Sequence, residues 1–352
     1  MRTPNPFELE YTPQFAELLH NLNISVALST YQAGKVVMIS AFNKDRLIQF
    51  PRTFENAMGM AYKDGKLAVS AKSSVEVLKN ESELAKSYPK KPNTYDAMFV
   101  PRASYHTGYL ALHDMAYLNK KLVAVNTLFS CLSYINDEEN FTPFWQPPFI
   151  DDLKPEDRCH MNGMATENGE IKYLTALGTG NTAQEWRDKK MSGGIIMEYP
   201  SGKIITDGLA MPHSPRIFNN KLYVLNSAQG ELLEIDRETG KKELVVNLGG
   251  FARGMEMVGD YLFIGVSKLR HNSKVFNDLP IANTSYAGII AVHLPYKTIA
   301  GTARYKMSVD EIYDVKILEN IKRPNILAMN NEFKDSTISF ANQHYWGTVV
   351  KE

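Results

Sequence analysis

The feature that most constrains this chain is a short strand–turn–strand pattern that begins six times. Residues 113–127, HDMAYLNKKLVAVNT, show it plainly, with two apolar runs on either side of a turn-like Asn-Lys-Lys. The first strands of the repeats begin, about 38 to 60 residues apart, near Met58, Asp114, Asn162, Ser214, Arg253 and Tyr313. Repeats of this length, each with several short strands, predict an all-β fold, a six-bladed β-propeller.

The two ends of the chain complete each other in this repeat pattern. The last first strand, residues 313–319, has no companions, whereas residues 25–50 hold three strands without a first strand. Joining them closes the ring and removes the exposed sheet edges of an open array. We therefore expect one propeller domain over residues 1–352, with a short helix at 12–22 and a tail at 320–352 that packs across a face.

Charge and hydropathy argue against several classes of protein. Lys plus Arg equal Asp plus Glu at 39 each, so the chain has no overall basic surface for nucleic acid or anionic membranes. No stretch approaches the roughly 20 apolar residues that cross a bilayer, and the N-terminus lacks the apolar core of a signal peptide. We expect a cytoplasmic protein with reduced Cys131 and Cys159 and without nucleic-acid or membrane partners.

Polar side chains gather in two sets of loops that meet on one face of a propeller. A structural protein is expected to fill such a funnel with small and apolar residues, but here the residues are polar and mostly cationic. The loops entering the inner strands and the loops after the second strands carry His113, Asp114, His160, Asn162, His213, Arg216, Arg253, Tyr31, Gln32, Lys35, Asn126, Lys268 and Arg270. This convergence predicts a binding site at the mouth of the central channel.

Three histidines fall at nearly equivalent positions in three consecutive blades: His113, His160 and His213. Three imidazoles can bind zinc, iron or manganese and leave a coordination position open for substrate. Each can equally hydrogen-bond within its own blade, because no HxH or HxxxH spacing supports a metal. A third reading is acid/base chemistry without metal, with Asp114 in the same catalytic group. Nothing indicates a nucleotide or redox cofactor.

Basic residues at the same face predict the capture of a small anion such as a carboxylate, phosphate or sulfate. These residues are Arg158, Arg216, Arg253, Lys268 and Arg270. In the opposing interpretation, arginines near the blade ends pair with acidic residues and hold the loops.

A long polar insertion, residues 178–194, carries Trp186 and predicts a lid over the funnel. With Trp186, we expect the following side chains to contact the substrate: Tyr31, Gln32, Lys35, Asn126 and Asn162.

Several phrases resemble those of a bacterial family known mainly as a domain of unknown function. They include STYQAGK (29–35), PPFIDDLKPEDRCHMNGMA (147–165), MPHSPR (211–216) and GFARGM (250–255). The resemblance covers residues 25–318 and implies a six-bladed propeller with no established activity. This chain has Met161 where the family often has leucine.

Together these patterns predict a propeller enzyme of the lyase or hydrolase type that acts on a small anionic metabolite or modified amino acid. The histidines bind a divalent metal or transfer protons, and the arginines and lysines orient the anion. The alternative is a noncatalytic propeller that binds a small anionic ligand or a protein partner through the same face. The oligomeric state stays open.

Overall fold

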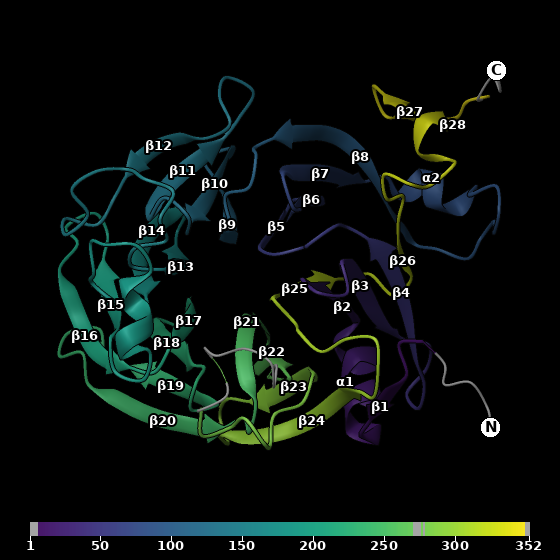
Figure 1. Ribbon diagram of the computed structural model, residues 1–352. Helices are drawn as coiled ribbons and strands as arrows, with labels where there is room; N and C mark the ends of the chain where they lie inside the picture. Colours follow the sequence, from purple (N-terminus) through teal and green to yellow (C-terminus); the bar gives the residue numbers. More distant parts are fainter. Residues whose placement is uncertain (1–5, 270–275, 277–278, 349–352) are drawn as a thin grey trace.

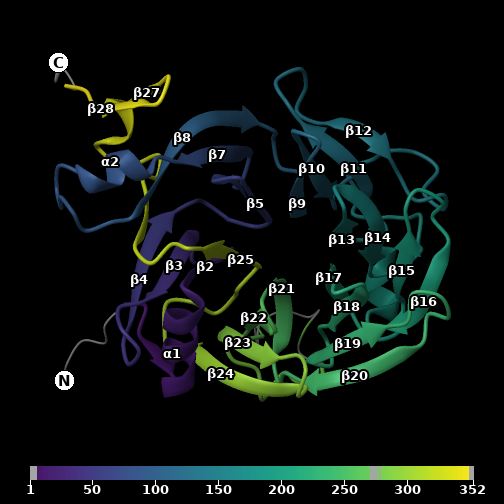
Figure 2. The same cartoon turned by 180° about the vertical axis from the view of Figure 1, so that it is seen from behind.

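The computed structural model describes residues 6–269, 276 and 279–348. Over these residues the chain forms six sheets of four or five strands, arranged as blades around a central axis (Figure 1). The view from behind shows the same closed ring (Figure 2). The six-bladed β-propeller predicted from the repeats is therefore confirmed.

Five blades follow one another along the chain, each running from the axis outward. The first two are β5 (Met60–Lys63), β6 (Lys66–Ser70), β7 (Ser74–Asn80), β8 (Ala97–His106) and β9 (Leu112–Leu118), β10 (Lys121–Asn126), β11 (Cys131–Ile135), β12 (Thr142–Trp145). The next two are β13 (Met161–Glu167), β14 (Glu170–Ala176), β15 (Gly194–Glu198), β16 (Ile204–Leu209) and β17 (Pro212–Phe218), β18 (Lys221–Asn226), β19 (Glu231–Ile235), β20 (Lys242–Asn247). The fifth is β21 (Phe251–Val258), β22 (Tyr261–Ser267), β23 (Gly288–His293) and β24 (Thr298–Tyr305).

The sixth blade joins the two ends of the chain, as the repeat pattern predicts. Its strands, from the axis outward, are β25 (Asp314–Glu319), β2 (Ile24–Thr30), β3 (Lys35–Ala41) and β4 (Leu47–Thr53). β25 pairs antiparallel with β2 from Ile24 opposite Glu319 to Ser29 opposite Asp314. This pairing leaves no open edge between the first and last blades.

Short helices and a short strand lie outside the four-stranded pattern of the blades. Helix α1 (Pro13–Leu22) begins with proline in the first turn, where its missing N–H costs nothing. Its buried residues Phe15 and Leu19 join the core beside β24, and β1 (Leu9–Tyr11) pairs with the same strand. A 3₁₀ helix, η1 (Glu185–Lys189), lies in the insertion between β14 and β15.

The C-terminal tail lies along one blade. β26 (Pro324–Ile326) pairs parallel with β8, and the hairpin of β27 (Thr337–Phe340) and β28 (Gln343–Trp346) follows the 3₁₀ helix η2 (Lys334–Ser336). Trp346 donates a hydrogen bond to Leu84 O in helix α2 (Ser82–Lys86), at the outside of the ring (Figure 1). The tail therefore extends an outer blade edge, and the expectation that it crosses a face is wrong.

Apolar side chains fill the space between neighbouring blades. Among the described residues, each of the six blade–blade interfaces has its own cluster of buried side chains. A sheet with only one buried face shows alternating apolar and polar residues along each strand. Here neighbouring blades cover both faces, and the middle strands are therefore almost continuously buried.

None of the described helices combines the length and the apolar composition needed to cross a bilayer.

Polar latches join the inner strands around the axis. In alternate blades a buried side-chain oxygen accepts a backbone N–H of the next blade: Asp314 from Met60 (2.8 Å), Asp114 from Met164 (3.1 Å) and Ser214 from Gly254 (2.9 Å). The blades between them carry glycine at the matching position: Gly59, Gly163 and Gly254. A Cβ on Gly254 would lie 2.6 Å from Asp314 Cα, so the small residue is what allows neighbouring inner strands to approach.

Gly254→Ala should therefore destabilise the ring more than Gly259→Ala does. Both glycines have a positive φ, but a Cβ on Gly259 meets nothing within 4 Å. We expect Gly259→Ala to cost about 1 kcal/mol of backbone strain and Gly254→Ala more than about 3 kcal/mol. Urea unfolding of the two variants measures this, and equal losses would contradict the role given to Gly254.

Candidate functional site

Seven side chains form a belt across the end of the channel at which the inner strands begin. Centres of successive rings, or of ring and guanidinium, lie between 4.5 and 5.7 Å apart in the order Trp186, His160, His113, Tyr313, Arg253, Phe251 and His213. They come from five of the six blades. We call this group the histidine belt, and it brings together all three histidines that the sequence singled out.

His113 is held by its own blade through Nδ1. This nitrogen lies 2.8 Å from Ala111 O and 2.8 Å from the hydroxyl of Thr127. Thr127 donates its own proton to Met161 O, so it must accept from the imidazole. The proton of neutral His113 therefore resides on Nδ1, and Nε2 keeps its lone pair.

His213 repeats the same arrangement two blades further round the ring. Its Nδ1 lies 2.9 Å from Met211 O and 3.0 Å from the hydroxyl of Ser227, which donates to Ala252 O. Nε2 of His213 is buried and has no hydrogen-bond partner among the residues that the structure describes.

The turns before these two histidines share an unusual backbone. Ala111 has φ +53° and Met211 has φ +51°, in the left-handed region that residues with a Cβ rarely adopt. Each turn aims its carbonyl at the imidazole two residues later. Strained backbone of this kind concentrates at functional sites.

Burial keeps both imidazoles neutral. Desolvation lowers the pKa of His113 and of His213 well below the usual 6.5. Electrostatic interaction with His160 adds to the lowering for His113, and the positive charge of Arg253 adds to it for His213. Both histidines are therefore hydrogen-bond acceptors at Nε2 at neutral pH.

His160 is oriented by a carboxylate instead of a carbonyl. Its Nδ1 lies 2.8 Å from Asp157 Oδ1, and the other oxygen of Asp157 accepts the indole N–H of Trp186 at 3.2 Å. Trp186, from the long insertion, lies against the imidazole with ring centroids 4.5 Å apart. Asp157 thus fixes both the histidine and the tryptophan of the insertion.

Arg253 supplies the positive charge of the belt. Its guanidinium lies 4.9 Å from the ring centroids of both Phe251 and Tyr313, and Nη1 bonds to Glu311 at 2.7 Å. Nε is buried and finds no acceptor in the described part of the chain. Burial also raises the pKa of Tyr313 well above 10, so its hydroxyl stays protonated.

Other predicted site residues lie outside the belt. Arg216 and Asp114 form a two-pronged ion pair further along the channel, with Nη1 to Oδ2 at 2.7 Å and Nη2 to Oδ1 at 3.1 Å. Both ends of the Asn162 amide bond to the scaffold: Nδ2 donates to Pro212 O, and Oδ1 accepts from the hydroxyl of Thr175.

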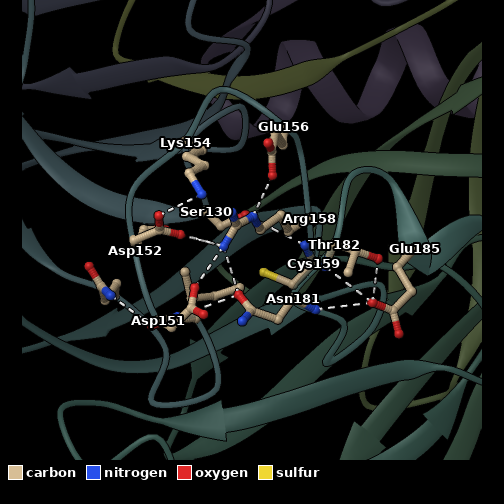
Figure 3. A network of polar contacts seen from close by, with 12 residues as sticks. Ser130, Asp151, Asp152, Lys154, Glu156, Arg158, Cys159, Asn181, Thr182 and Glu185 are labelled. Carbon is tan, nitrogen blue, oxygen red and sulfur yellow. Dashed lines mark hydrogen bonds and ion pairs between the residues drawn. The ribbon is translucent and has the colours of Figure 1, made fainter.

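Arg158 is the centre of a loop network (Figure 3). Its guanidinium reaches Asp151, Asp152 and Glu156 at 2.9, 2.7 and 2.7 Å, and Asn181 at 2.8 Å. Asn181 begins the insertion that carries Trp186. The contacts thus match the loop-holding interpretation, and Arg158 braces the base of this insertion.

The remaining candidates lie around the rim. Tyr31 is 6.2 Å from Tyr313 between ring centroids, whereas Gln32 and Lys268 are exposed. Lys35 Nζ donates to Thr53, and Asn126 accepts from Phe129 N in its own turn. Arg270 lies outside the described residues.

A metal centre is not preformed in the described part of the chain, where no group of three or more His, Cys, Asp or Glu side chains is arranged to hold an ion. Whether the histidines bind zinc, iron or manganese stays a prediction.

Phe251 of the belt was not predicted as a site residue from the sequence. Asp157 and Glu311, which bond to His160 and Arg253, were not predicted either. Thr127 and Ser227 do leave a signal, because each hydroxyl stands 14 residues after the histidine that it contacts.

Acidification should destabilise the protein through His113 and His213. Their folded pKa lies below the unfolded value, so the stabilising contribution is present above about pH 6.5 and is lost as the pH falls. Each histidine adds a slope of up to about 1.4 kcal/mol per pH unit below that value. Urea unfolding across this range should be flatter in the double variant His113→Gln/His213→Gln, and an unchanged slope would contradict the burial of neutral histidine.

Comparisons with known proteins agree with this architecture. A crystal structure of a nidogen/laminin complex matches with a TM-score of 0.55 at 10% identity, covering 84% of this chain and 99% of the other. A crystal structure of a protein of unknown function from Bacteroides caccae matches with a TM-score of 0.51 at 9% identity, covering 84% and 98%. At these identities the likeness concerns the fold alone.

Sequence comparison adds a family to the fold. No curated protein matches the chain. The family model described as a domain of unknown function, DUF4915, matches residues 13–327, and the chain therefore belongs to the DUF4915 family.

Proposed function

We propose that the protein is a propeller enzyme that transfers protons to or from a small anionic molecule at the histidine belt. The reaction is of the lyase or hydrolase type. The observation that carries this proposal is the repeated arrangement of His113 and His213, each neutral and fixed through Nδ1–H, with Nε2 of His213 left without a partner among the described residues.

The two imidazoles are suited to act as general bases. A buried acceptor without a partner costs about 1–3 kcal/mol, so Nε2 of His213 favours a ligand that donates to it. Because its pKa is low, the base is unprotonated at neutral pH and can take a proton from substrate or from water. The protonated hydroxyl of Tyr313, close to His113, donates to the oxygen on which negative charge develops.

Arg253 is the residue that we assign to the anion. Arg158 and Arg216 are already surrounded by carboxylates, whereas Nε of Arg253 has no acceptor among the described residues. Glu311 offsets much of the charge of Arg253. We therefore expect hydrogen bonds from Nε–H of Arg253 and from the hydroxyl of Tyr313 to recognise one anionic oxygen, without a strongly positive field.

A metal-dependent form of the same chemistry is the second mechanism. The Nδ1–H tautomer that leaves a base at Nε2 also leaves Nε2 free as a metal ligand. In that form His113, His160 and His213 would hold zinc, iron or manganese, and the metal would supply a Lewis acid.

A reducing, cytoplasmic setting is part of the proposal. Cys131 and Cys159 are both free and buried, and burial raises the pKa of each thiol to about 12. Such thiols are inert and need no oxidising compartment.

His213→Gln should lower turnover by roughly 10²- to 10⁴-fold, because a general base contributes about that much. The assay is a screen of small carboxylic esters, lactones and hydroxy acids. His293→Gln is the matched control, since His293 stacks on Tyr261 and Tyr296 in an outer strand away from the belt.

The metal content of protein purified without a histidine tag separates the two mechanisms. Stoichiometric metal that is lost in His213→Gln would indicate the metal-dependent form. Full turnover in His213→Gln would contradict both forms, and ligand binding without any turnover would favour the noncatalytic propeller.

Arg253→Gln should weaken binding of small carboxylates by about tenfold or more, the usual worth of a charge-assisted hydrogen bond. Calorimetric titration with a panel of hydroxy acids and amino acids measures this. Arg237→Gln is the control, because Arg237 forms an ion pair with Glu167 at the far end of β13, whereas the belt lies where the inner strands begin. Equal affinity in Arg253→Gln and wild type would remove Arg253 from the proposal.

A further inference from the structure

A second polar site lies at the opposite end of the channel from the histidine belt. A cavity of about 260 Å³ is lined there by later residues of all six inner strands, from Tyr62 and Lys63 on β5 to Lys316 on β25. An adjoining cavity of about 270 Å³ shares Tyr62, Lys63, Glu256 and Lys316 with it. This space greatly exceeds the roughly 30 Å³ of one water molecule, so it can admit a small organic ligand.

The charged groups around this space balance. Three positive and three negative side chains line the two cavities: Lys63, Arg216, Lys316, Asp114, Glu256 and Glu319. Two of the cations are already paired: Arg216 lies 2.7 Å from Asp114, and Lys316 lies 3.2 Å from Asp314, a buried carboxylate that lines neither cavity. The formal charges of the lining side chains therefore cancel, and neither sign dominates the walls.

Glu256 and Lys316 face each other without a direct hydrogen bond. Glu256 Oε2 lies 4.0 Å from Lys316 Nζ, and both side chains line both cavities. This separation is too long for a hydrogen bond. A ligand hydroxyl can span it, because one oxygen accepts from the ammonium and donates to the carboxylate.

Charged ligands fit this arrangement less well than neutral ones. A cation at Glu256 meets the ammonium of Lys316 4.0 Å away. An anion at Lys316 or Arg216 meets the carboxylates that these two already bind. The described residues also contain no group of three acidic or histidine side chains arranged to hold a metal. Neutral groups that both donate and accept hydrogen bonds can bond to cationic and anionic side chains alike, without repulsion from either.

The walls add apolar surface to this polar centre. Aromatic rings of Tyr62, Tyr117 and Phe218 line the cavity of about 260 Å³ together with the charged groups. Flat apolar rings beside paired donors and acceptors match a molecule with one face of C–H groups and a rim of hydroxyls. We propose that this cavity binds a neutral polyhydroxylated molecule, a monosaccharide or cyclitol, through hydroxyls held between Glu256 and Lys316.

The proposal is tested by titrating the full chain with glucose, galactose, mannose and myo-inositol and observing saturation-transfer NMR signals of each. We expect at least one of them to bind with millimolar affinity, and Glu256→Gln to weaken that binding by about tenfold. Glu243→Gln is the matched control, because Glu243 pairs with Lys297 on an outer strand. Urea unfolding confirms first that both variants fold.

The outcomes also separate this site from the histidine belt. Binding that is lost in Glu256→Gln but kept in His213→Gln supports a polyol site at this end. Binding that is kept in Glu256→Gln, or lost in His213→Gln, overturns it. So does the absence of binding by all four probes, or competition of the bound probe by ammonium or acetate at equal concentration.

Discussion

The structure depends on the buried acceptors that latch one inner strand to the next. A carboxylate deprived of water is costly unless every oxygen is occupied, so Asp114 is tolerated only because other blades supply its partners. It accepts the amide of Met164 on β13 and two N–H groups of Arg216 on β17. One side chain on β9 thus fixes three blades. Asp314 joins two blades, because it accepts the amide of Met60 on β5 and pairs with Lys316 on its own strand.

The latches also set the geometry of the candidate site. Each latch residue directly follows a belt residue in the sequence: Tyr313 before Asp314, His113 before Asp114, and His213 before Ser214. Because these pairs alternate around the ring, the rings of Tyr313 and His113 meet across a blade that contributes no belt residue. The pairing of Asp114 with Arg216 further offsets the charge beside His113. Burial then dominates the pKa of this imidazole, which stays neutral.

The fold could be predicted from the sequence because a propeller is built from repeats, and a recognisable hairpin begins each blade. The closure followed from counting strands, and the convergence of His113 and His213 followed from their place in the repeat. What the sequence could not supply was the choice of partner. Arg216 and Arg253 were both predicted to bind an anion, yet Arg216 bonds to one carboxylate through both of its Nη atoms, whereas Nε of Arg253 has no acceptor among the described residues. In the repeat, Asn162 and not His160 occupies the position of His113. His160 lies two residues earlier, and it reaches the belt through the turn before β13 and its bond to Asp157.

The closure of the ring determines when the histidine belt can form during synthesis of the chain. Tyr313 and Asp314 belong to the last inner strand, and Asp314 N bonds to the hydroxyl of Ser29, 285 residues earlier in the chain. Contacts this far apart are slow to form because the whole intervening loop must first close. A growing chain on the ribosome can build several blades and still lack one wall of the histidine belt. The candidate site is therefore incomplete in any growing chain that has not yet reached Tyr313.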